Sequence, residues 1–245
     1  MEAVSFMAPS PMQTGIGGLD ERLGGGLPAG SQVLIVSNSE TAVRMFCQQV
    51  SFNLSQNGNR VLYLTLTKDP AYIREEMALY DWDTTLQEKK ARWDFVDIYT
   101  SRVDSMLQRT DYSNFLGESD PLVCIRGRII PEIKKRDVVV LDTLSDLLLR
   151  YETKSLVELL EAFGAVIRKS ESIALLPIID VMHDKNVTAI LAHLADVAVE
   201  LAINELSFEG KLRFWKMRKV RLEPFFLPFS MTTRGIVAET FRRIS

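Results

Sequence analysis

The residues that could bind a nucleotide follow two apolar runs of the sequence. Ser37 and Arg44 come after the run VLIV at residues 33–36, and Asp142 follows the run VVVL at residues 138–141. A hydroxyl and a cation after one strand, with a carboxylate after another, are the groups that hold phosphates and their Mg²⁺ ion. Just upstream, residues 14–30 hold seven of the chain's 13 glycines. This arrangement is typical of the approach to a phosphate-binding loop.

The loop itself lacks the residues that phosphate binding needs. A P-loop has the pattern G-x-x-x-x-G-K-[ST], in which backbone N–H groups surround the phosphates, a lysine neutralises them and a hydroxyl holds Mg²⁺. Residues 37–45 read SNSETAVRM and contain no glycine. Glu40 adds a negative charge, which at ~5 Å and an effective dielectric of ~20 repels a phosphate charge by roughly 3 kcal/mol. We therefore expect Ser37, Arg44 and Asp142 to be vestigial cofactor-binding residues, with no catalytic residue and no metal site.

Two interpretations of these residues stay open. Arg44 falls at or next to the lysine position, so a diverged loop could still bind ATP weakly through Arg44 and Ser37. Met45 follows and cannot hold a metal ion. Asp142 could orient Mg²⁺ through water, but without a P-loop we favour a structural role, in which it caps or hydrogen-bonds the loop TLSD that follows it.

A second group of charged residues lies near the C-terminus. The stretch KLRFWKMRKVR holds six cations and no acid: Lys211, Arg213, Lys216, Arg218, Lys219 and Arg221. Alternation with Leu212 and Phe214 predicts a strand with one apolar and one cationic face. The cationic face could be a solvated hairpin, an interface with acidic residues of another chain such as Glu40 or Glu75–Glu76, or a nucleic-acid groove with Phe214 and Trp215 as stacking platforms.

The histidines and cysteines do not form a metal-binding pattern. His183 and His193 are ten residues apart with no cysteine near them. Cys47 and Cys124 both lie in apolar surroundings, which favours buried thiols in a reducing compartment over a disulfide.

Short apolar runs alternate with helical patterns over most of the chain. The patterns predict strands at 31–36, 60–66, 93–99, 137–144, 172–179 and 196–203, and helices at 44–56, 70–80, part of 121–136 and 155–170. Residues 104–118 are expected to be irregular, and Pro131 to end or kink its helix. Residues 211–222 and 227–241 alternate like antiparallel strands, with a hairpin turn at Arg234-Gly235.

These elements predict an α/β fold built on a mostly parallel twisted sheet. The strands are almost wholly apolar, which indicates helices on both faces, and antiparallel hairpin strands extend the sheet at its C-terminal end. Ligands of such sheets bind beyond the carboxyl ends of the strands. We expect residues 1–13 to be an N-terminal arm or tail and residues 14–245 to form a single domain.

Composition points to an ordinary globular protein. The chain has 245 residues, of which 47% are apolar and 25% charged, and its net charge is −3. This charge gives no reason to expect a nucleic-acid partner beyond a local basic patch. No stretch has the ~18–20 apolar residues of a membrane span, and no secretory signal is evident, so we expect a cytoplasmic protein without a membrane partner.

The order of four motifs resembles the KaiC-like branch of the RecA-superfamily ATPases. The opening TGIGGLDERLGGGLPAG is similar to that family's T-G-[IV]-x-G-L-D and G-G-G-[IL]-P-x-G elements. RVLYLTLTKDPAYIREEMALYDWD resembles its second strand and following helix, and DVVVLDTLSDLLL its Walker B strand. WKMRKVRLEPFFLPFSMTTRGIVAE resembles its closing hairpins. The resemblance covers about residues 14–240.

The resemblance implies an ATP-binding, RecA-like fold that assembles in rings, but this sequence departs from the family's catalytic pattern. Thr67 and Lys68 stand where the family has a pair of glutamates, and Pro177 lies near the place of its γ-phosphate sensor. Lys216 and Arg218 match the K-x-R pair that reaches a neighbour's nucleotide.

We therefore expect a non-hydrolysing structural or regulatory module that assembles with itself or with a RecA/KaiC-like paralogue and needs no cofactor. The alternatives are a weak nucleotide-binding ATPase or switch, which would use ATP and Mg²⁺, and an accessory protein that binds nucleic acid.

Overall fold

A single sheet organises the described part of the chain. The computed structural model describes residues 11–107, 120–204, 206–218 and 225–238, and within these residues the sheet has nine strands in the order β3-β2-β4-β5-β1-β6-β7-β8-β9. Pairing is parallel from β3 to β6 and antiparallel from β6 to β9. The strands are β1 (Ser31–Ser37), β2 (Val61–Thr65), β3 (Trp93–Asp97), β4 (Val138–Asp142), β5 (Ile173–Ile179), β6 (Val197–Asn204), β7 (Glu209–Met217), β8 (Phe225–Thr232) and β9 (Gly235–Ala238).

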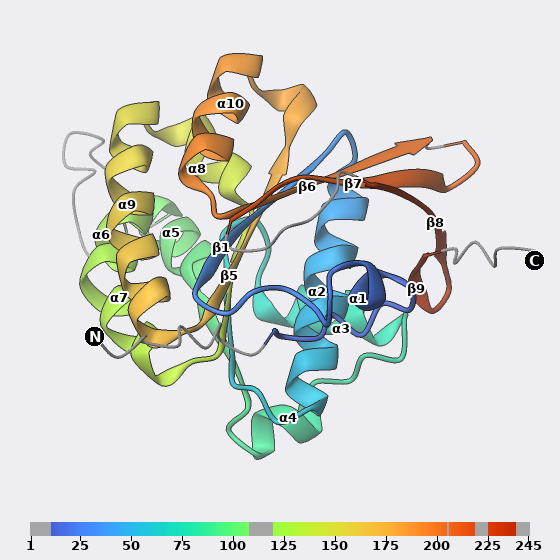
Figure 1. Cartoon of the computed structure of the whole chain (residues 1–245). Helices are drawn as coiled ribbons and strands as arrows, with labels where there is room; N and C mark the ends of the chain where they lie inside the picture. Colours follow the sequence, from blue (N-terminus) through green and yellow to red (C-terminus); the bar gives the residue numbers. More distant parts are fainter. Residues whose placement is uncertain (1–10, 108–119, 205, 219–224, 239–245) are drawn as a thin grey trace, which may run out of the picture.

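Helices cover both faces of the parallel strands. Those on one side are α1 (Leu19–Arg22), α2 (Glu40–Gln56), α3 (Pro70–Ala78) and α4 (Thr85–Lys89); those on the other are α5 (Ile98–Leu107), α6 (Pro121–Cys124), α7 (Ile130–Glu132), α8 (Leu144–Arg150), α9 (Thr153–Ser170) and α10 (Lys185–Leu194). A π-helical turn at Ile125–Ile129 joins α6 to α7, and 3₁₀ turns lie at Ile133–Lys135 and Asp180–Met182. Strands β8 and β9 curl round the side on which α2 lies (Figure 1). The predicted RecA-like fold class is confirmed.

The burial of each strand explains its sequence pattern. All residues of β1, β2, β4 and β5 are buried, so these strands are nearly continuous apolar runs. In β7, Leu212 and Phe214 are buried while Lys211 is exposed, as the alternation predicted. Two buried clusters lie on the two faces of the sheet, one packed on α2 and the other on α8 to α10.

Three predicted boundaries were wrong. Helix α2 begins at Glu40, so only Asn38 and Ser39 separate it from β1. The strand predicted at 93–99 ends at Asp97, whose carboxylate accepts a hydrogen bond of 2.8 Å from the Thr100 N–H and so caps α5. Residues 104–107, expected to be irregular, therefore lie in α5, and residues 108–119 lie outside the described residues.

Pro131 changes the winding of its helical segment without ending it. Proline has no N–H to donate to the preceding turn. The chain passes from α6 through the π turn to α7 and a final 3₁₀ turn, and stays helical over 121–135.

Pro177 interrupts one side of β5. This strand pairs with β1 along its whole length but with β4 only from Ile173 to Leu175. The Ile173 N–H points towards the β4 side, where it donates to Asp137, and alternation places Pro177, which has no N–H, on the same side. Beyond it, the Ile179 N–H donates to the Ser145 hydroxyl at 2.9 Å, so a side chain takes over where strand pairing ends.

The N-terminal boundary of the domain lies before the predicted one. Met12 and Leu27 exchange two backbone hydrogen bonds, of 2.7 and 2.8 Å, so residues 11–13 of the predicted arm belong to the fold. Gly26 is required opposite them, because its φ of 133° suits glycine and a Cβ would strike the Met12 carbonyl. Residues 1–10 lie outside the described residues. No described helix is long and apolar enough to cross a membrane.

Candidate functional site

The guanidinium of Arg44 lies at the carboxyl ends of β2 and β4, where a ligand of this fold would be expected. Arg44 comes from the first turns of α2 and is only 5% exposed. Its Nε donates to the Asp142 carboxylate at 3.2 and 3.5 Å, and one terminal nitrogen donates to Glu40 at 2.7 Å and to the Thr67 hydroxyl at 3.2 Å. The other terminal nitrogen lies 3.7 Å from Glu76. Every nitrogen of the guanidinium therefore has an acceptor or counter-ion in the chain itself.

Asp142 is held from two sides at the end of β4. Its carboxylate, 1% exposed, accepts from Arg44 and also from the Tyr63 hydroxyl, which is 2.8 Å from Oδ2. Tyr63 lies on the neighbouring strand β2, which pairs with β4 in parallel register. The favoured interpretation of Asp142 as a cap of the loop TLSD is therefore wrong, because its carboxylate pairs with α2 and β2 instead.

Glu76 connects the cluster to α3. One of its carboxylate oxygens lies 3.7 Å from Arg44, and the other accepts a hydrogen bond of 2.8 Å from the Gln48 amide on α2. Glu40 stands in the first turn of α2 and is the most exposed of the three carboxylates, with 52% of its side chain accessible. A carboxylate there interacts favourably with the helix dipole, at the same end of a helix that attracts phosphates in other proteins.

Burial and neighbouring charges shift the pKa values of Arg44 and Asp142 in opposite directions. Burial alone would lower the pKa of Arg44, but the attraction of Asp142, Glu76 and Glu40 outweighs it, so the pKa of Arg44 is raised and the guanidinium stays charged. Full burial raises the pKa of Asp142, against the opposing effects of Arg44 and the Tyr63 hydrogen bond. Burial and the neighbouring Asp142 also raise the pKa of Tyr63, so the phenol stays protonated and donates its hydrogen bond.

The connection from β1 to α2 is tied to β6. The Ser37 hydroxyl donates to the Leu201 carbonyl and accepts from the Ser39 N–H at 3.1 Å. The Asn38 side chain makes two hydrogen bonds with the backbone of Ile203, of 2.9 and 3.0 Å, and so continues the β1–β6 pairing by one residue. Of the three predicted site residues, the structure brings Arg44 and Asp142 together, whereas it engages the Ser37 hydroxyl with a neighbouring strand.

Two further features of the described residues bear on the predicted absence of a metal site and of a catalytic glutamate. The described residues contain no group of three or more His, Cys, Asp or Glu side chains that could hold a metal ion. Thr67, at the position of a family glutamate, accepts from Arg44 and is not a base at neutral pH. Lys68 lies over the ring of Tyr72, with Nζ 5.0 Å from the ring centroid.

The cations of the basic strand have partners within the chain. Lys216 donates to the carbonyls of Ala192 and His193 at the end of α10, at 2.6 and 2.8 Å, and Arg218 donates to the same His193 carbonyl at 3.0 Å. Basic groups at a helix C-terminus satisfy its free carbonyls. Burial, together with Arg218, lowers the pKa of Lys216. Arg218 also lies 3.7 Å from the Asp196 carboxylate, so both Lys216 and Arg218 have partners in their own chain without a nucleotide.

The other basic residues differ in exposure and pairing. Arg213 makes an ion pair of 2.7 Å with Glu200 on β6 and lies over the rings of Trp215 and Phe226. Lys211 is exposed and has no ion pair among the described residues. Lys219 and Arg221 lie outside the described residues.

The two histidines occupy different environments. His183 Nε2 lies 2.9 Å from the Ser145 hydroxyl, which joins the segment after β5 to α8, and burial lowers the pKa of His183. Ser145 itself is 1% exposed, so a hydrolytic role for this pair has no structural support. His193 is exposed at the end of α10.

Sequence reasoning missed two members of the Arg44 cluster. Tyr63 gives no signal along the chain, because it meets Asp142 only through the pairing of β2 with β4. Glu76 entered the sequence analysis only as one acidic residue that another chain's basic strand could contact, whereas the structure places it beside Arg44 of its own chain. The four-residue spacing of Glu40 and Arg44 on one helix was a usable signal for that ion pair.

Comparison with known proteins agrees with this architecture. A family model described as the KaiC ATPase matches residues 12–240. A UPF0273 protein of Pyrococcus furiosus is 26% identical over 229 residues, covering 92% of each chain, and one of Thermotoga maritima is 26% identical over 239 residues, covering 92% of this chain and 94% of its own. A solved KaiC-like protein from Pyrococcus horikoshii superposes with a TM-score of 0.71 at 24% identity, covering 94% of this chain and 99% of that one.

The family match begins at the glycine-rich opening and extends beyond the last described strand. It includes β1, the end of β4 where Asp142 lies, and the antiparallel strands that close the sheet. The chain therefore belongs to the KaiC family of the RecA superfamily.

Proposed function

We propose that this protein is a non-hydrolysing KaiC-like module that acts by assembling with other chains. The observation that carries the proposal is the engagement of Arg44 by groups of its own chain: two of its three nitrogens donate hydrogen bonds, and the third lies 3.7 Å from the Glu76 carboxylate. A cation that serves ATP must leave its donors free for phosphate. Here Nε and one terminal nitrogen donate within the chain, the other terminal nitrogen faces the Glu76 carboxylate, and the Asp142 carboxylate that would orient Mg²⁺ accepts from Arg44 and Tyr63.

Electrostatics also opposes nucleotide binding. Glu40, Glu76 and Asp142 surround a single cation, so the cluster carries a net charge of −2 when all four groups are ionised. A triphosphate brought within ~5 Å of one unbalanced carboxylate would be repelled by roughly 3 kcal/mol per charge pair at an effective dielectric of ~20. Only two residues separate β1 from α2, so the loop is also too short to surround phosphates.

Calorimetric titration with Mg-ATP tests this proposal. We expect no binding tighter than about millimolar, because the ~3 kcal/mol repulsion is about two orders of magnitude in affinity. Titration of the Arg44→Ala variant is the matched control. A micromolar Kd that is lost in this variant would favour the alternative function, a weak nucleotide-binding ATPase or switch that uses Arg44 and Asp142.

The partner that we propose is a second copy of the chain or a KaiC-like paralogue in the cytoplasm. The support is an outward face of the antiparallel strands that presents Lys211 and Phe226, the latter 62% exposed, and an acidic Glu40 that is half exposed elsewhere on the molecule. Unlike charges on two surfaces of one chain favour head-to-tail contact.

A nucleic-acid groove has less support than a protein interface. Arg213, Lys216 and Arg218 are used within the chain, by Glu200 and by the end of α10. Trp215 is partly buried and has Arg213 over its ring, so it is not a free stacking platform. Single-strand binding requires free cations beside free aromatic faces.

A further inference from the structure

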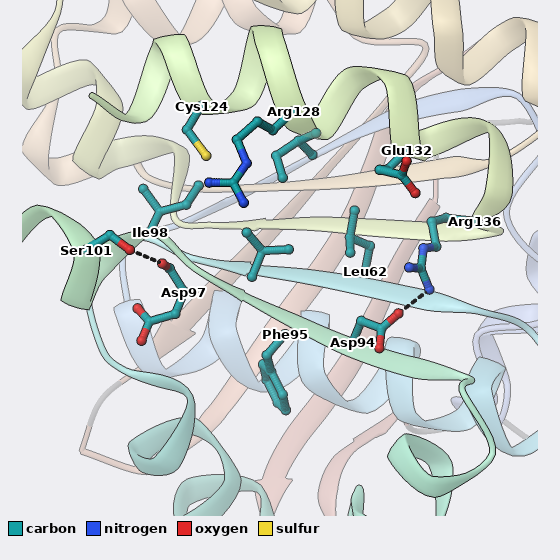
Figure 2. Close-up of a pocket in the computed structure, with 12 residues that line it drawn as sticks. Leu62, Asp94, Phe95, Asp97, Ile98, Ser101, Cys124, Arg128, Glu132 and Arg136 are labelled. Atoms are coloured by element: carbon teal, nitrogen blue, oxygen red, sulfur yellow. Dashed lines mark hydrogen bonds and ion pairs between the residues drawn. The ribbon is translucent and has the colours of Figure 1, made fainter. Parts of the chain in front are cut away.

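A cavity of about 500 Å³ lies between the edge strand β3 and the helical segment 121–135. It is on the sheet face opposite to α2 and is therefore separate from the Arg44 cluster. Figure 2 shows β3 below the cavity and the helical segment above it. The volume is in the range that suits a small organic ligand, about 300–1,000 Å³.

The lining of the cavity combines apolar side chains with charged groups on both sides, with Asp94 and Asp97 on β3 below and Arg128 and Glu132 on the helical segment above (Figure 2). Leu62, Val96, Ile98 and Ile129 supply apolar surface from β2, β3, α5 and the π turn. Arg128 projects from the helical segment towards the middle of the cavity (Figure 2). A site of this kind binds the apolar body of a ligand and orients it by a few polar contacts.

Arg128 is the one cation of the cavity wall without a counter-ion in the described residues. Arg136 pairs with Asp94, and Glu132 pairs with Lys135 at 3.1 Å. Asp97 also lines the cavity, but its carboxylate accepts from the Thr100 N–H and points away from Arg128 (Figure 2). Because Arg136 and Glu132 each have an ion-pair partner, Arg128 is left as the unpaired guanidinium that faces the apolar side chains of the cavity.

A second donor in the wall lacks an acceptor. The Nε of Arg136 is buried and has no hydrogen-bond partner. A buried donor without an acceptor is costly, and a ligand oxygen would satisfy it. Arg128 and Arg136 are eight residues apart, which along a helix is about 12 Å.

The backbone that carries Arg128 is also unusual. Arg128 lies within the π-helical turn Ile125–Ile129, just before Pro131. Such turns are rare and often occur at functional sites.

We propose that this cavity binds a small organic anion with an apolar body. The carboxylate or similar group pairs with Arg128 and the apolar body lies on Leu62, Val96 and Ile98. An oxygen at the far end of a longer ligand would also accept from the Nε of Arg136, but this contact is not required for binding. An amine of the same shape would be repelled by Arg128, and an uncharged analogue would leave the guanidinium unpaired.

Three probes of matched shape test the proposal: 4-phenylbutyrate, 4-phenylbutanol and 4-phenylbutylamine. Ligand-observed NMR with the full chain should show saturable binding of the carboxylate, with the alcohol and the amine at least tenfold weaker. Arg128→Gln should weaken phenylbutyrate binding at least tenfold. Arg126→Gln is the matched control, because Arg126 lies on the same segment, pairs with Glu158 and does not line the cavity.

Alkylation of Cys124 gives an independent readout at the cavity itself. Cys124 lines the cavity and is partly exposed, whereas Cys47, the other cysteine of the chain, is fully buried. Burial raises the pKa of the Cys124 thiol, so iodoacetamide labelling is followed at alkaline pH. Phenylbutyrate should slow this labelling and the alcohol should not.

Three outcomes would overturn the proposal: no phenylbutyrate binding at millimolar concentration, equal affinity for the alcohol, or binding that Arg128→Gln leaves unchanged. Slower labelling of Cys124 that persists in the Arg128→Gln variant would likewise show that Arg128 does not hold the anionic group of the ligand. None of these results depends on whether the Arg44 cluster binds ATP.

Discussion

Arg44 and Asp142 form a buried ion pair in which each residue depends on the other. Removing one partner of such a pair leaves an uncompensated buried charge, which typically costs about 3–5 kcal/mol. We expect Arg44→Met to lower the free energy of unfolding by this amount, because Asp142 is 1% exposed and has only Tyr63 as a remaining donor. Urea denaturation followed by circular dichroism measures the change.

A double-mutant cycle separates the ion pair from simple loss of packing. Arg44→Met combined with Asp142→Asn should recover a large part of the lost stability, since no charge is then left buried. Arg74→Met is the control, because it also removes a long side chain from an ion pair. Arg74 is 41% exposed in its pair with Glu88, so we expect Arg74→Met to lower the free energy of unfolding by only about 0–1 kcal/mol. Equal losses in Arg44→Met and Arg74→Met would contradict the assigned role of the cluster.

Individual residues of the site were predictable only where the chain brings them together locally. Glu40 and Arg44 lie four residues apart on α2, so their contact follows from helix geometry. Tyr63 and Asp142 lie on neighbouring strands, and their meeting depends on the order of strands in the sheet. A strand order with β4 elsewhere would have left Tyr63 without this acceptor, and a single sequence does not specify that order.

At the scale of elements, α2 and β9 are joined by a pair of hydrogen bonds. The Gln49 amide donates to the Ile236 carbonyl at 3.0 Å and accepts from the Ile236 N–H at 2.7 Å. Gly235 precedes this contact with a φ of 97°, and a Cβ there would come within 2.5 Å of the Trp82 ring. We expect Gly235→Ala to lower the free energy of unfolding by roughly 1–3 kcal/mol, from backbone strain and overpacking.

Gly17→Ala is the matched control for Gly235→Ala, because nothing lies within 4 Å of a Cβ at Gly17 and its φ is not in the left-handed region. Thermal unfolding of both variants gives the comparison. If both variants lost the same stability, the contact of β9 with α2 would not be the cause.

His183 and Ser145 connect the segment after β5 to α8, and this link should respond to pH. Burial lowers the pKa of His183 in the folded state below its unfolded value, which is near 6.5. As the pH falls below about 6.5, the unfolded chain binds a proton at this site before the folded chain does, so stability decreases. We expect His183→Gln to show a flatter dependence of stability on pH between neutral and mildly acidic conditions.

The exposed His193 provides the control for this pH series. Urea titrations at several pH values measure how the free energy of unfolding changes with pH. We expect this dependence to be nearly the same in the His193→Gln variant and in the unchanged chain. If His183→Gln left the pH dependence of the free energy of unfolding unchanged, groups other than His183 would cause the loss of stability in acid.

Helices and strands could be predicted from the sequence where a single hydrophobic pattern ran through the whole element. The buried strands β1, β2, β4 and β5 are runs of aliphatic residues, and their period and length identify them. The start of α2 was missed because its first turn carries polar residues, and the start of α5 because the apolar pattern of β3 continues into Ile98 and Tyr99. Side-chain caps such as Asp97 decide such boundaries.

At the scale of the whole molecule, the antiparallel strands have two different faces. Their inner face packs on the α2 side, where Phe229 is buried and Phe225 packs against the same cluster. Their outer face carries Lys211 and Phe226, which lie on neighbouring strands. Of Phe225, Phe226 and Phe229, only Phe226 is therefore available for a contact with another chain.

The same geometry decides which variant can test assembly. Changing Lys216 and Arg218 to glutamate would place carboxylates against the carbonyls that end α10, so loss of an oligomer would not be distinguishable from damage to the fold. Lys211 and Phe226 are exposed, Lys211 has no ion pair in the described part of the chain, and Phe226 lies under the guanidinium of Arg213 on the neighbouring strand.

We therefore expect the protein to form an oligomer in solution at moderate salt. The double variant Lys211→Glu, Phe226→Ser should raise the dissociation constant of this oligomer at least tenfold. Higher salt should also weaken the oligomer, because exposed charge pairs are screened. Size-exclusion chromatography with light scattering measures both effects. Lys134→Glu is the control, since Lys134 is exposed in the helical segment beside β3, at the other edge of the sheet from β7 to β9, and undergoes the same change of charge. A strict monomer at high protein concentration, or equal responses of the two variants, would leave β7 as a solvated strand whose charges serve only this chain.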